Sequence, residues 1–191
     1  MNVKHVGLLF LVLASVLSGC SINHPVAKDY PDYLVEHGQV GNLPKTSLES
    51  TYGIDEQTEK HRYEFRAASV GYAHLWIVEF GKILEQTLNA PYVQESFGKL
   101  EKASATDAGN AIEFTLNSYE FKDYRAYVSM NIAMSKNGKE VLNKNYTSEG
   151  SSKGGQMWGA GPFGMKSATL DSTRSAIDKI LTQFINDIPQ E

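Results

Sequence analysis

The chain has 191 residues, which suits one domain with an N-terminal tail and is short for two full domains. Its 18 basic and 22 acidic residues give a formal net charge of -4, which argues against nucleic acid as a partner, because proteins that bind phosphate backbones are usually basic. The single cysteine, Cys20, excludes an intrachain disulfide and a cysteine-rich zinc or iron–sulfur site.

The first residues have the order of a signal peptide. A short start with one lysine is followed by a nearly continuous apolar run from Val6 to Leu17. A helix of that length rises only about 18 Å, whereas the hydrocarbon core of a bilayer is roughly 30 Å thick. The run is therefore too short to span a membrane, and we predict a signal peptide over residues 1–19.

Small residues then lead to the cysteine in the stretch Leu17-Ser18-Gly19-Cys20. This stretch resembles the lipobox of bacterial lipoproteins. The resemblance implies cleavage between Gly19 and Cys20 and acyl chains on Cys20, which would attach the chain to outer-membrane lipid. In the same proteins, a serine such as Ser21 in place of aspartate implies transport to the outer membrane, with the folded part facing the periplasm. The alternative is an ordinary secretory signal followed by a chance cysteine.

The stretch from Cys20 to about residue 60 shows no clear periodicity. Prolines and glycines interrupt it, and its apolar residues are scattered. We predict a flexible tether with at most one short helical turn. The alternative is that residues 30–35 pack on the domain as a strap.

The folded domain is predicted over residues 61–191. Alternation over residues 62–69 predicts a first strand, and apolar residues at steps of three and four predict a helix over residues 71–89. Pro91 prevents that helix from continuing. Alternation of apolar and polar residues predicts strands over 111–121 and 124–135. A short strand over 97–102, with Phe97 and Leu100 as its apolar positions, and a strand-like run over 140–147 complete the predicted β-rich centre.

Asn137-Gly138 lies between the last two predicted strands, and this pair favours a type I′ hairpin turn. A final amphipathic helix is predicted over residues 168–188, before Pro189. Strand, helix, antiparallel strands and helix together predict an α+β fold: a sheet of four to five antiparallel strands with two helices on one face.

This order of elements after a lipobox is similar to that of small envelope lipoproteins of the YajG-like kind. The same layout is similar to the periplasmic domain of the curli-secretion channel lipoprotein and, more loosely, to the lipopolysaccharide-transport lipoprotein. The resemblance covers residues 61–189 and rests on element order and on the stretch 111–147. Such proteins are assembly factors, oligomeric rings or accessory subunits, so it implies a non-enzymatic role with a protein partner or a homo-oligomer, and no cofactor.

Motifs of catalysis are weak in this sequence. Residues 159–164 read Gly-Ala-Gly-Pro-Phe-Gly, but a dinucleotide-binding glycine turn belongs in a βαβ unit, whereas the strands before it are predicted to be antiparallel. His24, His37, His61 and His74 are scattered along the chain, which gives no support for a zinc site.

The glycine-rich segment between Gly150 and Ser167 carries large apolar residues, which are costly in a loop unless they are buried or bind something. One hypothesis is that this segment is an interaction loop formed by Met157, Trp158, Phe163 and Met165. The alternative is that Trp158 folds back and plugs the end of the domain.

Together these features predict a lipid-anchored envelope lipoprotein with an accessory, assembly or oligomeric role. One alternative is a carrier or chaperone that binds an apolar ligand in a groove between helices and sheet. Another is an envelope hydrolase, which would need a clustered Ser/His/Asp geometry in a cleft.

Overall fold

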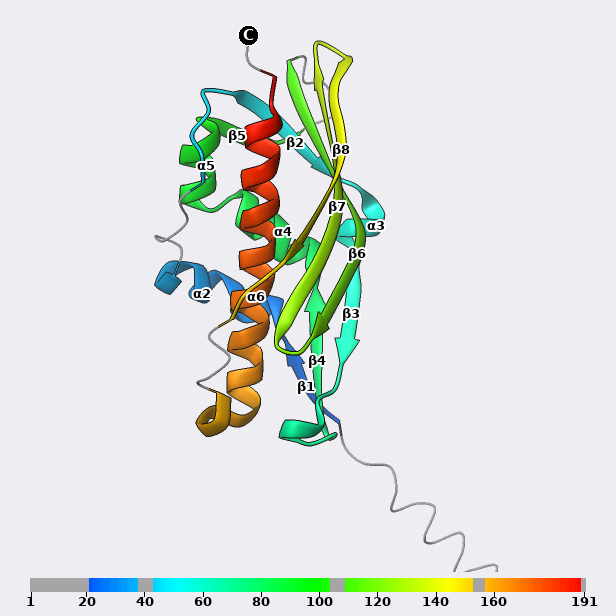
Figure 1. The fold of residues 1–191 in the computed structure, drawn as a ribbon, viewed down its shortest axis with the longest axis vertical. Helices are drawn as coiled ribbons and strands as arrows, with labels where there is room; N and C mark the ends of the chain where they lie inside the picture. Colours follow the sequence, from blue (N-terminus) through cyan, green and yellow to red (C-terminus); the bar gives the residue numbers. More distant parts are fainter. Residues whose placement is uncertain (1–20, 38–42, 104–108, 153–156, 190–191) are drawn as a thin grey trace, which may run out of the picture.

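The structure, a computed structural model, describes residues 21–37, 43–103, 109–152 and 157–189. The predicted signal peptide, Gly19 and Cys20 lie outside the described residues. Two mixed β-sheets and several helices form the fold (Figure 1), which confirms the predicted α+β class.

The larger sheet has five strands in the order β5-β2-β6-β7-β8. Antiparallel pairing joins β6, β7 and β8, as predicted, and the Asn137-Gly138 turn has the two positive φ angles of a type I′ hairpin, 51° and 77°. The prediction of a wholly antiparallel sheet was wrong, because β2 pairs in parallel with both β5 and β6. The strands are β2 Glu49–Ile54, β5 Lys99–Lys102, β6 Asn110–Lys122, β7 Arg125–Lys136 and β8 Lys139–Glu149.

The smaller sheet has the order β1-β4-β3, with β1 Ile22–Pro25, β3 Arg62–Phe65 and β4 His74–Glu79. The helix predicted over residues 71–89 was wrong in its first half, where the chain forms β4, and right in its second half, where it forms α4 (Phe80–Leu88). Trp76, Ile77 and Val78 are all buried, as in a central strand. For such a short apolar run, periodicity alone cannot distinguish a buried strand from a helix.

The prediction of a flexible tether over residues 20–60 was wrong for the described part of that segment. It forms β1, a 3-10 turn η1 (Ala27–Asp29), α2 (Tyr30–His37), β2 and α3 (Glu56–Glu59). Tyr30 is fully buried, and its hydroxyl hydrogen-bonds Thr87 of α4 at 2.7 Å, so the strap alternative describes this stretch better. Each element is short and pairs with residues far along the chain, which local pattern cannot reveal.

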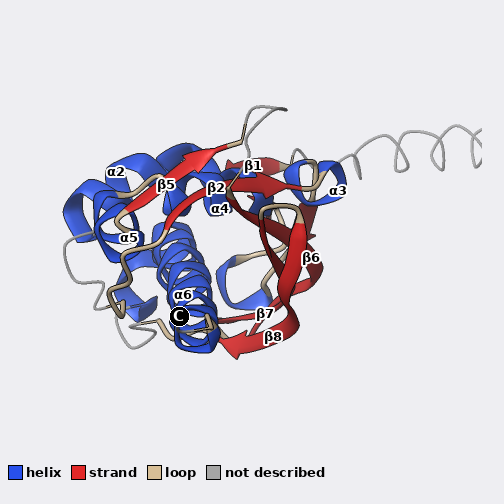
Figure 2. Ribbon diagram, turned by 90° about the horizontal axis from the view of Figure 1, so that it is seen from above, coloured by secondary structure: helices blue, strands red, loops and turns tan. Residues whose placement is uncertain are grey.

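The last helix, α6 (Met157–Asp187), occupies the centre of the molecule. In Figure 2 the larger sheet curves around one side of α6, while α2 and α5 (Pro91–Phe97) lie on the other side. Phe184 contacts the rings of Phe114 and Tyr146 on the sheet. The helix begins before the predicted start at residue 168 and has a kink at Gly161, whose φ is 52°. Its glycines and Pro162 weaken the helix signal there.

Gly150, directly after β8, allows the backbone to pass close to α6 because glycine has no Cβ atom. A Cβ atom at this position would lie 1.8 Å from the Ser172 carbonyl oxygen, a backbone atom that cannot move aside. We expect Gly150→Ala to lower the free energy of unfolding by about 2 kcal/mol in a urea titration. The control is Gly53→Ala, whose Cβ meets only the end of the Glu113 side chain and should cost much less. Equal losses would contradict this account of the contact.

Candidate functional site

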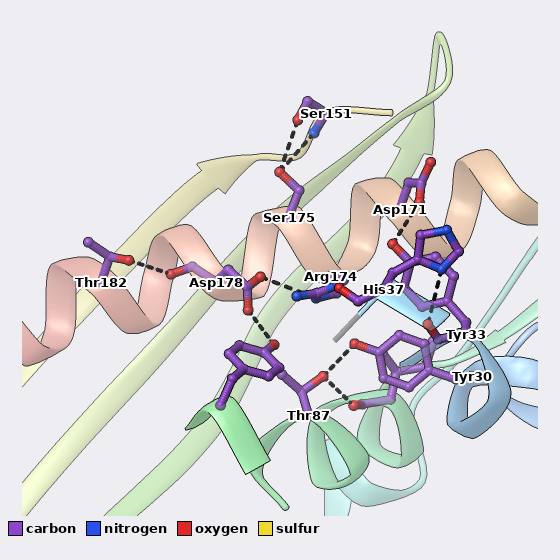
Figure 3. Close-up of polar contacts among 12 residues, drawn as sticks. Tyr30, Tyr33, His37, Thr87, Ser151, Asp171, Arg174, Ser175, Asp178 and Thr182 are labelled. Atoms are coloured by element: carbon purple, nitrogen blue, oxygen red, sulfur yellow. Dashed lines mark hydrogen bonds and ion pairs between the residues drawn. The ribbon is translucent and has the colours of Figure 1, made fainter. Parts of the chain in front are cut away.

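A cleft of about 890 Å³ opens between α2 and α6. The end of α2 forms one wall and successive turns of α6 form the other, and Ser151, just after β8, lies at its edge (Figure 3). It is lined by Asp29, Asp32, Tyr33, Glu36, His37, Leu43, Ser151, Ser152, Phe163, Lys166, Ser167, Leu170, Asp171, Arg174, Ser175, Asp178, Lys179 and Thr182.

Arg174 joins three elements at the floor of this cleft. Its Nη1 donates a hydrogen bond to the carbonyl oxygen of His37 at 2.6 Å, at the end of α2. Its Nε lies 3.4 Å from Oδ2 of Asp178, one turn further along α6, and its guanidinium carbon lies 4.9 Å from the ring centre of Tyr92 on α5. Only 6% of the residue is exposed, so this charge holds α2, α5 and α6 together.

Tyrosine hydroxyls bind two carboxylates of α6 (Figure 3). Tyr33 donates to Asp171 and Tyr92 donates to Asp178, each over 2.6 Å. Burial raises the pKa of both tyrosines, so both hydroxyls keep their protons. Burial also raises the pKa of Asp178, although the Tyr92 hydrogen bond and Arg174 act in the opposite direction. The floor is therefore a connected polar network in one fixed arrangement.

The cleft carries more negative than positive charge. Lys166 forms an ion pair with Asp29, and Lys179 donates to the carbonyl oxygen of Glu149 at 2.7 Å. Five carboxylates face three cations, so the surplus is acidic and favours a positively charged ligand. The carboxylates are Asp29, Asp32, Glu36, Asp171 and Asp178, and the cations are Lys166, Arg174 and Lys179.

The residues of the predicted interaction loop have different environments in the structure. Phe163 lines the cleft and is 78% exposed, as the contact hypothesis requires. Met165 is only 2% exposed and belongs to the core, so its assignment to a contact surface was wrong. The helical turn that follows Gly161 directs residues two apart in different directions. The side chains of Met157 and Trp158 lie outside the described residues.

Strand pairing brings together two histidines that are far apart in the sequence. Nε2 of His24 on β1 lies 2.8 Å from Nδ1 of His74 on β4, and burial lowers the pKa of His24. His74 therefore lies on a strand and not on the predicted helix. Across the described ranges, no three His, Cys, Asp or Glu side chains gather in a geometry that could hold a metal ion.

The polar groups of the cleft mostly bind each other. The Ser175 hydroxyl accepts a hydrogen bond from the Ser151 amide at 3.2 Å, and Nδ1 of His37 lies 3.1 Å from the Tyr33 carbonyl oxygen. These contacts leave a shaped acidic surface that includes the exposed phenyl ring of Phe163, which suits binding. In the part of the chain that the structure describes, no helix has the length and hydrophobicity needed to span a membrane.

Arg174, Asp178 and Tyr33 were not identified as site residues from the sequence. One signal was available: Arg174 lies three residues before Ile177, on the apolar stripe of the last helix, and four residues before Asp178. A charged pair at this spacing on the inward face of a helix indicates a buried ion pair.

Comparison with known proteins shows a likeness to solved structures. No family model and no curated protein matches the chain. Among solved structures, it is similar to the crystal structure of protein XCC0632 from Xanthomonas campestris, assigned to the family DUF330. The TM-score is 0.46 and the sequence identity 15%, over 75% of this chain and 85% of that chain. A likeness at this level carries no conclusion about function.

Proposed function

We propose that the chain is a non-enzymatic lipoprotein, anchored by Cys20 to the periplasmic face of the bacterial outer membrane, that holds a partner protein in the cleft between α2 and α6. The observation that carries the anchor is the stretch Leu17-Ser18-Gly19-Cys20 after a short apolar run. The only cysteine of the chain lies at the one position where a lipobox requires it.

The cleft favours a basic segment of a partner. Its surplus of carboxylates complements lysine or arginine side chains, and electrostatic complementarity of this kind selects partners and speeds association. The exposed ring of Phe163 offers an apolar contact beside these charges, and aromatic residues are enriched among the residues that dominate binding energy. The partner proposed here is therefore a positively charged segment with at least one apolar side chain.

The filling of the core supports docking over transport of an apolar ligand. A carrier would use the space between α6 and the larger sheet. Side chains of Phe114, Tyr146 and Phe184 occupy that space, and each is at most 1% exposed. The cleft on the other side of α6 is polar and charged, which suits a protein segment better than an apolar molecule.

Lipidation is tested by growing cells with a fatty-acid analogue. We expect the wild-type chain to incorporate the label and Cys20→Ser to lose it completely, because serine cannot form the thioether. The matched control is Ser21→Asp, which should keep the label and move the protein to the inner membrane. Equal labelling of wild type and Cys20→Ser would refute the anchor.

A further inference from the structure

The folded domain begins almost at the proposed lipid anchor. Ile22 is the first residue of β1, which pairs in parallel with β4, and its amide donates to the Ala73 carbonyl oxygen at 2.8 Å. Only Ser21 separates it from Cys20. One residue spans at most about 3.6 Å, so the Cα atoms of Cys20 and Ile22 can be at most about 7 Å apart.

The polar layer of a bilayer has a similar thickness. The hydrocarbon core measures about 30 Å and the whole bilayer about 40–45 Å, which leaves roughly 5–7 Å of headgroups on each side. Acyl chains on Cys20 would lie in the hydrocarbon, and stable anchoring needs several of them. The start of β1 must then lie in the headgroup layer or directly against it.

The surface around this point has the chemistry of a membrane interface. We call it the anchor tip and define it as Ser21, Ile22, Arg66 and Tyr72. Ile22 is 49% exposed and Tyr72 is 70% exposed, although both are large and apolar. Exposed tyrosines are typical of membrane–water interfaces, because the ring prefers the apolar side and the hydroxyl prefers water.

Arg66 supplies a positive charge at the same place. Its guanidinium donates to the Tyr72 carbonyl oxygen and, over 3.2 Å, to the Ser21 hydroxyl. Both partners are neutral, and none of the ion pairs among the described residues includes Arg66. An uncompensated arginine beside exposed apolar side chains fits the phosphates of lipid headgroups.

We propose that the anchor tip rests in the headgroup layer and holds the domain upright on the membrane. The inference depends on the lipid anchor of the proposed function and adds an orientation to it. In Figure 1 the chain enters the domain at one end of its long axis, where η3 (Ala68–Val70) also lies, and the hairpin between β7 and β8 lies at the opposite end. That hairpin would point into the periplasm, away from the lipid.

The test uses the acylated full-length protein in vesicles of phosphatidylethanolamine and phosphatidylglycerol. Because Cys20 would be blocked by lipid, Tyr72→Cys provides the only free thiol for a nitroxide label. The collision rates of the nitroxide with oxygen and with a water-soluble nickel chelate measure how deep the label lies in the membrane. Val141→Cys is the matched control, since Val141 is also an exposed apolar residue and lies on β8 near the distal hairpin.

We expect a severalfold lower collision rate with the nickel chelate at position 72 than at position 141. Equal rates at the two positions would overturn the tip contact, as would spin–spin broadening at position 72, which would show two copies meeting there. Mass spectrometry of the same preparation keeps the two proposals distinct. Absence of acyl chains would refute the anchor, whereas an acylated protein with a water-exposed position 72 would refute only the orientation.

Discussion

Arg174→Ala is expected to lower the free energy of unfolding by about 3 kcal/mol, because it leaves the Asp178 carboxylate without its cation. Breaking a buried ion pair usually costs about 3–5 kcal/mol of unfolding free energy. We expect a loss at the lower end of that range, because 22% of the Asp178 side chain is exposed. The variant also loses the hydrogen bond to the His37 carbonyl oxygen, so the end of α2 loses its attachment to α6. Urea unfolding at neutral pH measures the loss.

The loss should depend on pH with a definite sign. Burial already raises the pKa of Asp178, and removing Arg174 raises it further. A carboxyl whose pKa is higher in the folded than in the unfolded state stabilises the fold at low pH, and this contribution disappears as pH rises through the folded-state pKa. The deficit of Arg174→Ala should therefore shrink between about pH 7 and about pH 4.

A double variant provides the control for this explanation. Arg174→Met combined with Asp178→Asn removes both charges and keeps an acceptor for the Tyr92 hydroxyl. We expect it to recover much of the stability lost by Arg174→Ala and to show little dependence on pH. A deficit of Arg174→Ala that stays constant with pH, or a double variant as unstable as the single one, would contradict a role for the uncompensated carboxylate.

Phe163→Ser is expected to remove partner binding and leave the fold intact. The ring is 78% exposed, so its loss removes little buried area, whereas it is the large apolar group that the cleft offers to a partner. Met165→Ser is the matched contrast two residues away. It places a hydroxyl in the core and should lower the free energy of unfolding by about 2–4 kcal/mol.

Both variants are compared by thermal unfolding and by co-purification of the crosslinked partner from cells. We expect Phe163→Ser to unfold at the wild-type temperature and to lose binding, and Met165→Ser to unfold at a lower temperature. A destabilised Phe163→Ser would show that the ring supports the fold, and full partner recovery by this variant would remove Phe163 from the proposed interface.

The sequence predicted correctly those elements whose own residues show a clear local pattern. β7 alternates over ten residues and β6 over a shorter stretch, and Asn137-Gly138 supplies the two positive φ angles of the turn between β7 and β8. The end of the last helix was clear from its apolar stripe and from Pro189. These features depend on residues close together in the chain, so they can be identified without the fold.

The missed elements depend on distant partners. The apolar run of β4 suits either a helix or a strand, and only its place between β1 and β3 decides for the strand. β2 alternates over only six residues and is stabilised by β5 and β6, which lie far along the chain. The cleft was missed for the same reason: Tyr33 and Asp171, in contact at its wall, are 138 positions apart.

Photocrosslinking in intact cells tests whether a lipid-anchored protein holds a basic partner segment in this cleft. A photoreactive residue replaces Phe163, and the control replaces Val35, which is 81% exposed on α2 and does not line the cleft. We expect one defined envelope protein, crosslinked from position 163 and not from position 35, through a peptide rich in lysine or arginine. Crosslinks only to the chain itself, equal crosslinking from both positions, or none from position 163 would contradict the proposal.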